Sequence, residues 1–202
     1  MTSEPQEAFV WVWLPGAEDP VVAGRLDVVG DIVAFTYGRS YLERDERIAL
    51  YLPELPLRRG RIMPLVGMIA GCIADAAPDS WGRRVILNRR IGRQAVDTTD
   101  LNLLTYLLES GTDRIGALDF QASSTKYVPR SQGEAQLSEL ARLAESAQKV
   151  EEGIPLSPTL DQALLHGSSV GGARPKVLLS DGARRLIAKF SSTTDTLLPS
   201  VA

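Results

Sequence analysis

The sequence predicts an α+β fold, in which a mixed module of strands and helices is followed by helices and a β-hairpin. Apolar runs broken by glycines, typical of strands, lie between residues 9 and 37. Apolar residues at helical spacing, preceded by capping residues, follow in the middle of the chain. Two short apolar runs around an Asp-Gly pair then indicate a hairpin near the C-terminal end.

The composition is that of an ordinary globular protein. The 202 residues are 44% hydrophobic and 23% charged, which excludes disordered, collagen-like and coiled-coil classes. No apolar stretch approaches about 18 residues and the first residues carry no basic run, so we expect neither a membrane span nor a secretory signal. A single cysteine, Cys72, excludes a disulfide framework and predicts a cytoplasmic protein.

The first strands are expected at residues 9–14, 21–29 and 32–37, because turn-forming glycines punctuate these three apolar runs. Three strands so close together along the chain predict a meander. The following segment, residues 41–60, contains two prolines and is expected to be irregular or to lie at a sheet edge.

Helices are expected next. Residues 63–77 are largely apolar and predict a short buried helix that ends at a proline. Asp79-Ser80 supplies a cap for a helix over residues 81–91, and Asp97-Thr-Thr-Asp100 supplies the caps for a further helix over 101–109. Residues 116–120 indicate a returning strand.

A polar segment, residues 121–133, is the best candidate for a linker. Leucines and alanines at helical spacing predict a helix over 134–150, and a Ser-Pro pair predicts a short helix over 157–166. The final hairpin is expected to pair residues 177–179 with residues 185–190.

The most informative stretch is residues 167–176, Gly-Ser-Ser-Val-Gly-Gly-Ala-Arg-Pro-Lys. Backbone N–H groups in such a small-residue segment can approach an anion closely, and Lys176 and Lys189 add positive charge. Residues 168–190 hold five basic residues against one acid, although the net charge of the chain is −3. Ala173 stands where a Walker A loop needs lysine. Spacing alone leaves two interpretations open, a phosphate-binding loop or a glycine-rich connection with a solvated basic face.

Three segments in this order resemble the HipA family of toxin protein kinases. They are Asp75–Arg84, Leu107–Leu118 and the run from Ser169 to Lys176 with its hairpin ending Ile-Ala-Lys-Phe. They contain, in turn, Pro-Asp-Ser-Trp-Gly-Arg, Asp-Arg-Ile-Gly-Ala-Leu and Gly-Gly-Ala-Arg-Pro-Lys. Together these segments span most of the chain.

The resemblance implies that ATP with Mg²⁺ binds at residues 168–176 and that Lys189 holds the nucleotide phosphates, as the β3 lysine of protein kinases does. Ser169 stands at the family's autophosphorylation position, where modification expels the loop and switches the kinase off, although the pattern does not separate it from its neighbour Ser168. The implied phosphate-binding residues are Ser168, Ser169, Val170, Gly171, Gly172, Ala173, Lys176 and Lys189.

The resemblance also divides the chain into two domains. Residues 8–121 would form an N-terminal docking domain, and residues 122–202 would begin a kinase domain with a partial N-lobe, its glycine-rich loop and its hairpin. The implied partner is a small helix-turn-helix antitoxin. The chain would then contact nucleic acid only indirectly, through that partner, and the resemblance implies no membrane association.

Phosphoryl transfer also needs a catalytic aspartate and side chains that hold Mg²⁺, which the family carries in a helical C-lobe after the lysine. Only 13 residues follow Lys189, and Asp195 is the sole acid among them. We therefore expect a truncated HipA-type kinase toxin with no catalytic residue and no metal ligand, inactive unless a second polypeptide completes it. The alternative is a regulatory or antitoxin-like subunit, or a remnant, that binds a partner kinase or the antitoxin.

Two further features have simpler interpretations. The five arginines between residues 83 and 93 are expected to form a solvated, salt-bridged helix face, and the sharper hypothesis is a contact surface for an acidic partner or for DNA. His166, the only histidine, is expected at a helix end rather than in a catalytic or zinc site. The three tryptophans are assigned to the core.

Overall fold

The computed structural model describes residues 4–93 (backbone only at 91–93), 101–112, 114, 116–130, 135–156, 164, 174–182 and 184–191. Helices and largely antiparallel sheets occur together, which confirms the predicted α+β class. None of the helices in these ranges has the length and hydropathy needed to cross a bilayer.

The chain divides into two compact units that interleave along the sequence. Unit 1 comprises residues 1–77, 102–108 and 114–129, and unit 2 comprises residues 78–101, 109–113 and 130–202. The sequence suggested a linear division into 8–121 and 122–202, whereas the contacts group the helix that follows Pro78 with the C-terminal segments.

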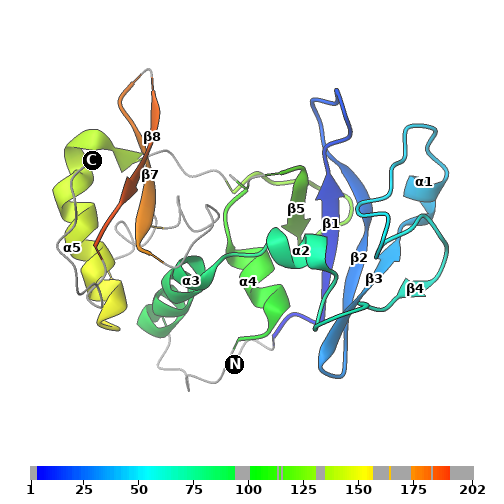
Figure 1. The fold of residues 1–202 in the computed structure, drawn as a ribbon, viewed down its shortest axis with the longest axis horizontal. Coiled ribbons are helices and arrows are strands. Elements are labelled where there is room, and N and C mark those ends of the chain that lie inside the picture. Colours follow the sequence, from blue (N-terminus) through cyan, green and yellow to red (C-terminus); the bar gives the residue numbers. More distant parts are fainter. Residues whose placement is uncertain are drawn as a thin grey trace. The chain divides into compact units, whose positions relative to one another are not determined.

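Unit 1 is built on a five-stranded sheet, in which strands from both ends of the unit lie side by side (Figure 1). Its order is β4-β3-β2-β1-β5 and every pairing is antiparallel. The strands are β1 (Glu7–Val12), β2 (Val21–Val29), β3 (Ile32–Tyr37), β4 (Arg61–Ile62) and β5 (Leu118–Gln121). The predicted meander of the first three strands is confirmed.

One face of this sheet forms the core of unit 1. Alternate residues of β1 point into it, among them Val10 and Val12, and Phe120 of β5 joins them. The pairing of β1 with β2 shifts register opposite Gly24. A Cβ on Gly24 would lie 2.6 Å from the ring of Phe35, so only glycine fits this close approach of two strands.

Three helices belong to unit 1: α1 (Arg39–Leu42), α2 (Gly71–Asp75) and α4 (Leu103–Glu109), of which α4 contributes all but its last residue. Leu104 and Leu107 bury α4 against the sheet core. The Asn102 side chain caps α4, because its Oδ1 accepts the N–H of Thr105 at 2.9 Å. The caps expected at residues 97–100 lie outside the described residues.

The predicted helix over residues 63–77 is wrong for its first half, since only Gly71–Asp75 is helical. Pro64 disfavours helical backbone at the residue before it, and Gly67 adopts a φ of 73°, which is left-handed. The side chains of Leu65 and Val66 are 69% and 80% exposed, so the first part of this apolar run does not line the core.

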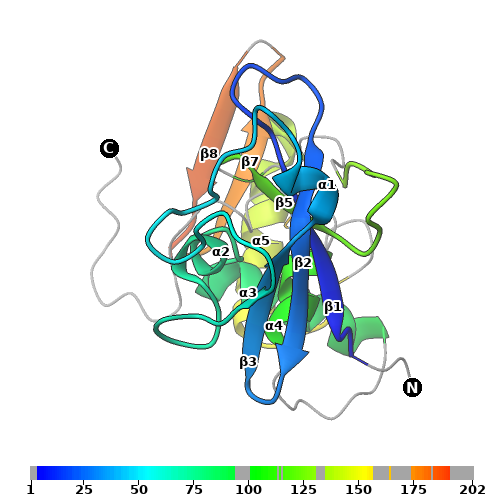
Figure 2. The ribbon, with the colours of Figure 1, turned by 90° about the vertical axis from the view of Figure 1, so that its right-hand side faces the viewer.

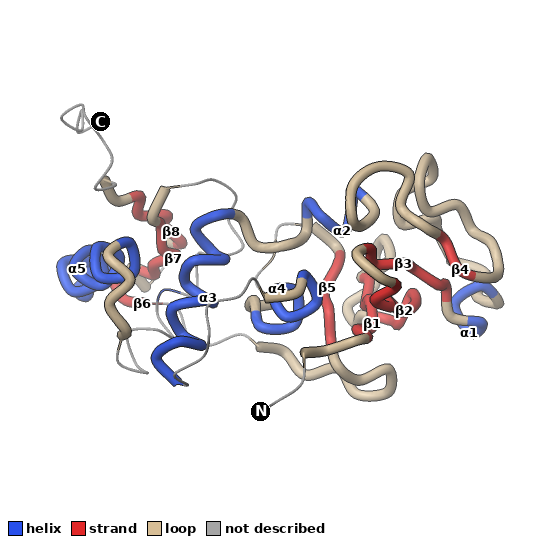
Figure 3. Tube along the Cα trace, turned by 90° about the horizontal axis from the view of Figure 1, so that it is seen from below, coloured by secondary structure: helices blue, strands red, loops and turns tan. Residues whose placement is uncertain are grey.

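Unit 2 combines two helices with a three-stranded sheet. Its elements are α3 (Ser80–Arg93), β6 (Ala135–Gln136), a 3-10 turn η1 (Leu137–Glu139), α5 (Leu140–Glu151), β7 (Lys176–Ser180) and β8 (Arg185–Lys189). The sheet order is β6-β7-β8, with β6 parallel and β8 antiparallel to β7. Figures 2 and 3 show β7 and β8 side by side, and α5 lies beside this sheet in Figures 1 and 3.

The predicted final hairpin is confirmed. Asp181 and Gly182 form its turn, with Gly182 at a φ of 77° and the Asp181 N–H bonded to the Arg184 carbonyl at 3.1 Å. The predicted helix over 134–150 is confirmed from Leu137 onward, after the short strand β6. The predicted short helix over 157–166 lies outside the described residues, apart from Leu164.

Candidate phosphate-binding hairpin

Most of the glycine-rich segment lies outside the described residues. This applies to Ser168, Ser169, Val170, Gly171, Gly172, Ala173 and to His166. Arg174 is the first described residue after this gap; it is exposed and lies two residues before β7 begins. The geometry of the candidate site therefore comes from Lys176, Lys189 and the elements that hold them.

Lys189 is exposed at the end of β8. Side chains alternate along this strand, so Arg185, Ile187 and Lys189 share its exposed face, and Ile187 is 51% exposed. Leu186 and Ala188 point to the opposite face, across from the buried Val177 and Leu179 of β7. This face of β8 presents two cations and one aliphatic side chain to solvent.

Lys176 has a different environment, although it faces Lys189 across the hairpin. It begins β7, is only 2% exposed, and its Nζ donates to Asp79 Oδ2 at 2.7 Å. Burying an ammonium group is costly unless it is paired, and Asp79 supplies the pair. The sequence predicts that Lys176 holds a phosphate. In the structure, however, its ammonium group already has an ion-pair partner in Asp79.

Asp79 connects this lysine to the start of α3. Its Oδ1 accepts the N–H of Gly82 at 2.7 Å, the bond of a helix N-cap, which confirms the cap predicted at Asp79-Ser80. Two residues on, the buried Trp81 donates its indole N–H to the Lys176 carbonyl at 3.1 Å. The Pro-Asp-Ser-Trp-Gly-Arg motif thus binds the lysine of the Gly-Gly-Ala-Arg-Pro-Lys motif, within unit 2.

Sequence reasoning treated Asp79 as a helix cap and Lys176 as a phosphate ligand, and it missed their contact. The two residues are 97 positions apart, and neither spacing nor periodicity links them. The available signal was chemical, since a lysine that begins a buried strand needs an acid nearby.

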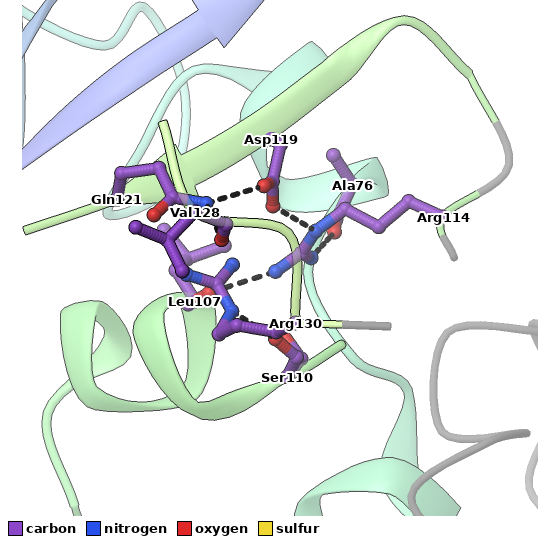
Figure 4. A network of polar contacts seen from close by, with 8 residues as sticks. All are labelled: Ala76, Leu107, Ser110, Arg114, Asp119, Gln121, Val128 and Arg130. Carbon is purple, nitrogen blue, oxygen red and sulfur yellow. Dashed lines mark hydrogen bonds and ion pairs between the residues drawn. The ribbon is translucent and has the colours of Figure 1, made fainter. Parts of the chain in front are cut away.

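The Asp-Arg-Ile-Gly-Ala-Leu motif has its arginine, Arg114, in unit 1 (Figure 4). Its buried guanidinium donates to Asp119 Oδ1 at 3.2 Å and to the Leu107 carbonyl at 2.7 Å, and it also bonds the Ala76 carbonyl. Gln121 donates to the other Asp119 oxygen at 2.9 Å. Arg114 therefore joins the end of α2, the last turn of α4 and strand β5.

Two arginines of α3 are paired with acids from elsewhere in unit 2. Arg90 lies 2.5 Å from Glu109, and Arg84 lies 3.6 Å from Glu151. Arg83 donates to the Pro78 carbonyl at 3.3 Å, and the side chain of Arg93 lies outside the described residues. These pairs favour the interpretation of a salt-bridged helix face.

Burial raises the pKa values of three groups of unit 1, Tyr37, Tyr41 and Cys72. Burial raises the pKa of Tyr37 to about 12, although its hydroxyl accepts the Leu50 N–H at 2.9 Å. Burial, followed by the charge of Glu54, raises the pKa of Cys72 to about 11. A thiol held protonated in this way is a poor nucleophile, so Cys72 is not a candidate for covalent chemistry.

No group of three or more His, Cys, Asp or Glu side chains within the described ranges is arranged to hold a metal ion. What the hairpin offers chemically is an exposed lysine, Lys189, at the end of its second strand. Such a group can hold an anion in place, and the described residues assign no acid or base to a bond-breaking step.

The family comparison agrees with the resemblance seen in the sequence. The family model described as HipA N-terminal domain matches residues 12–121, more than half of the chain. The match includes the first two motifs and ends with the last residue of β5. No curated protein matches the chain. The chain therefore belongs to the HipA family, through the N-terminal domain of that family.

Proposed function

We propose that this chain provides the docking domain and the nucleotide-phosphate-binding hairpin of a HipA-type serine/threonine kinase toxin. One observation carries the proposal, namely the exposed Lys189 at the end of β8, in the hairpin that follows the glycine-rich segment. Family membership supports it, because that family couples this N-terminal domain to a kinase domain. The ligand would be ATP with Mg²⁺, and Ser169 would be the site of autophosphorylation.

Within the proposal, backbone N–H groups of residues 168–173 surround the phosphates and Lys189 supplies a point charge. Arg185 on the same face adds positive potential. Phosphoryl transfer is assigned to no residue of this chain, because transfer needs a carboxylate at the acceptor hydroxyl and ligands for Mg²⁺. We therefore expect binding of nucleotide without transfer by the 202 residues alone.

The test is titration of the chain with the fluorescent analogue TNP-ATP in the presence of MgCl₂. Lys189→Met should weaken binding by about tenfold or more, since one charge-assisted contact is lost. Lys126→Met is the matched control, because Lys126 is an exposed lysine of unit 1. The affinity of this variant for TNP-ATP should equal that of the unmodified chain. Equal affinity of the two variants, or no binding by the unmodified chain, would count against the proposal.

Autophosphorylation is tested separately by incubation with ATP and MgCl₂ and intact mass measurement. We expect no added phosphate on the chain alone. Phosphate on Ser169 under these conditions would show that the chain carries its own catalytic carboxylate.

A second proposed role is docking of the helix-turn-helix antitoxin by unit 1. Eight of the 13 exposed large hydrophobic side chains of the described residues lie between residues 48 and 68, with Leu52 at 70% and Val66 at 80%. Large exposed apolar patches commonly mark protein interaction sites. Val66→Asp should abolish co-purification with a helix-turn-helix protein encoded beside the kinase gene, whereas Leu137→Asp, at a 43% exposed leucine of unit 2, should not.

A further inference from the structure

The buried Lys176 lies directly opposite Lys189, the proposed phosphate-binding lysine, in the terminal hairpin. Lys176 and Lys189 are direct partners in the pairing of β7 with β8. The neighbouring residues, Pro175 and Phe190, are joined by a backbone hydrogen bond of 2.9 Å. Lys176 and Lys189 therefore form the intervening non-hydrogen-bonded pair, the kind whose side chains approach most closely in an antiparallel ladder.

Like charges directly opposite each other on one sheet face are destabilising. The carboxylate of Asp79 removes this conflict, because it pairs with Lys176 at 2.7 Å and the pair is nearly enclosed, with Lys176 2% and Asp79 16% exposed. No ion pair of Lys189 occurs among the described residues. The hairpin thus carries one neutralised lysine and one available lysine.

We propose that Asp79 is a positioning residue for the phosphate site. Its carboxylate neutralises Lys176, which holds the start of β7 in place, and Lys189 is then the lysine that binds the phosphates. The proposal rests on the phosphate-binding function proposed above. It departs from the sequence expectation that both lysines bind phosphate, because the Nζ of Lys176 is buried against a carboxylate.

The same carboxylate also orders the entry to the hairpin. Asp79 Oδ1 caps α3, and Trp81, in the first turn of that helix, donates to the Lys176 carbonyl. The side chain and the carbonyl of Lys176 are therefore both held by the start of α3. The first residue of β7 is therefore fixed through both its side chain and its backbone.

The first measurement needs no nucleotide. Asp79→Asn retains a capping side chain but leaves Lys176 buried without its counter-charge, so the urea midpoint of unfolding should fall. Adding Lys176→Met removes the unpaired ammonium and should recover more than half of that loss. Additive losses in the double variant, or an unchanged midpoint for Asp79→Asn, would overturn the role of Asp79 as the partner of Lys176.

The second measurement separates an anchor from a ligand. Lys176→Met leaves the Asp79 carboxylate without its counter-charge next to the strand position that faces Lys189, so TNP-ATP with MgCl₂ should bind roughly tenfold more weakly through charge repulsion. The double variant Asp79→Asn/Lys176→Met should return to within about twofold of the unmodified chain. If Lys176 contacts the phosphates directly, the double variant stays as weak as Lys176→Met, and the proposal fails.

A matched control is the exposed pair Glu145–Lys149 on α5, whose charged atoms lie 2.6 Å apart. Glu145→Gln/Lys149→Met removes the same two charges and should change neither the urea midpoint nor the nucleotide affinity appreciably. If the unmodified chain binds no TNP-ATP, the proposed function fails and the positioning role fails with it. The urea measurements would then show a pair that serves the fold alone.

Discussion

The guanidinium of Arg114 donates to the carboxylate of Asp119 at 3.2 Å, and both side chains are almost fully buried, at 2% and 0% exposure. The guanidinium also lies 4.9 Å from the centre of the Phe120 ring. Removing one partner of a buried pair leaves the other charge without compensation. This pair therefore gives Arg114, from the Asp-Arg-Ile-Gly-Ala-Leu motif, a structural role in unit 1.

Arg114→Met should destabilise the chain by about 3–5 kcal/mol, measured by urea denaturation followed by circular dichroism. The double variant Arg114→Met/Asp119→Asn should be less destabilised than the single variant. Arg39→Met, which breaks an exposed pair with Glu43, should cost less than about 0.5 kcal/mol. A loss for Arg114→Met as small as that of Arg39→Met would contradict the assigned role.

Trp81→Phe should destabilise unit 2 by about 1–3 kcal/mol, because the Lys176 carbonyl would lose its indole donor in a buried setting. Circular dichroism is the suitable probe, since the substitution alters fluorescence. Trp13→Phe changes a half-buried ring in unit 1 and serves as the control. Equal midpoints for the two variants would show that the bond to Lys176 contributes no net stability.

Gly24→Ala should destabilise unit 1 by about 1–3 kcal/mol or more, because the new methyl group overlaps the Phe35 ring and the Thr36 carbonyl. Gly38 is the control, since its φ is −64° and the nearest atom to an added Cβ is 3.7 Å away. Gly38→Ala should be close to neutral in thermal unfolding. Equal shifts in Tm would refute the close-approach explanation.

Stability should decline at alkaline pH. Cys72 and Tyr37 have folded pKa values raised to about 11 and about 12, from ordinary values of 9.0 and 10.0. A raised pKa means that the unfolded chain loses the proton first, so the stability is complete below pH 9 and falls as the pH rises through the folded pKa values. Urea midpoints measured from pH 8 to pH 11 should decrease, and Cys72→Ala should flatten the decrease. A pH-independent midpoint over this range would contradict the burial of both groups.

Local sequence signals predicted helices and strands well where residues close together in the chain determine the local structure. Glycines and alternating apolar residues marked the strands 21–29 and 32–37, and both have these bounds in the structure. The Asp181-Gly182 turn marked the hairpin. The apolar run at residues 63–68 was misassigned as helix, because hydrophobicity alone does not distinguish a buried helix from an exposed loop that contains Pro64 and Gly67.

The sequence by itself determined the α+β class, the three family motifs and the charge of the terminal hairpin, because these depend on residue type and on spacing along the chain. Only the tertiary structure decided that Asp79 meets Lys176 and that Arg114 meets Asp119. The first pair is 97 residues apart, and it forms because a buried cation is stable only beside an acid that folding brings to it. Two lysines that look alike in the sequence thus have different environments, one enclosed in an ion pair and one exposed at the end of β8.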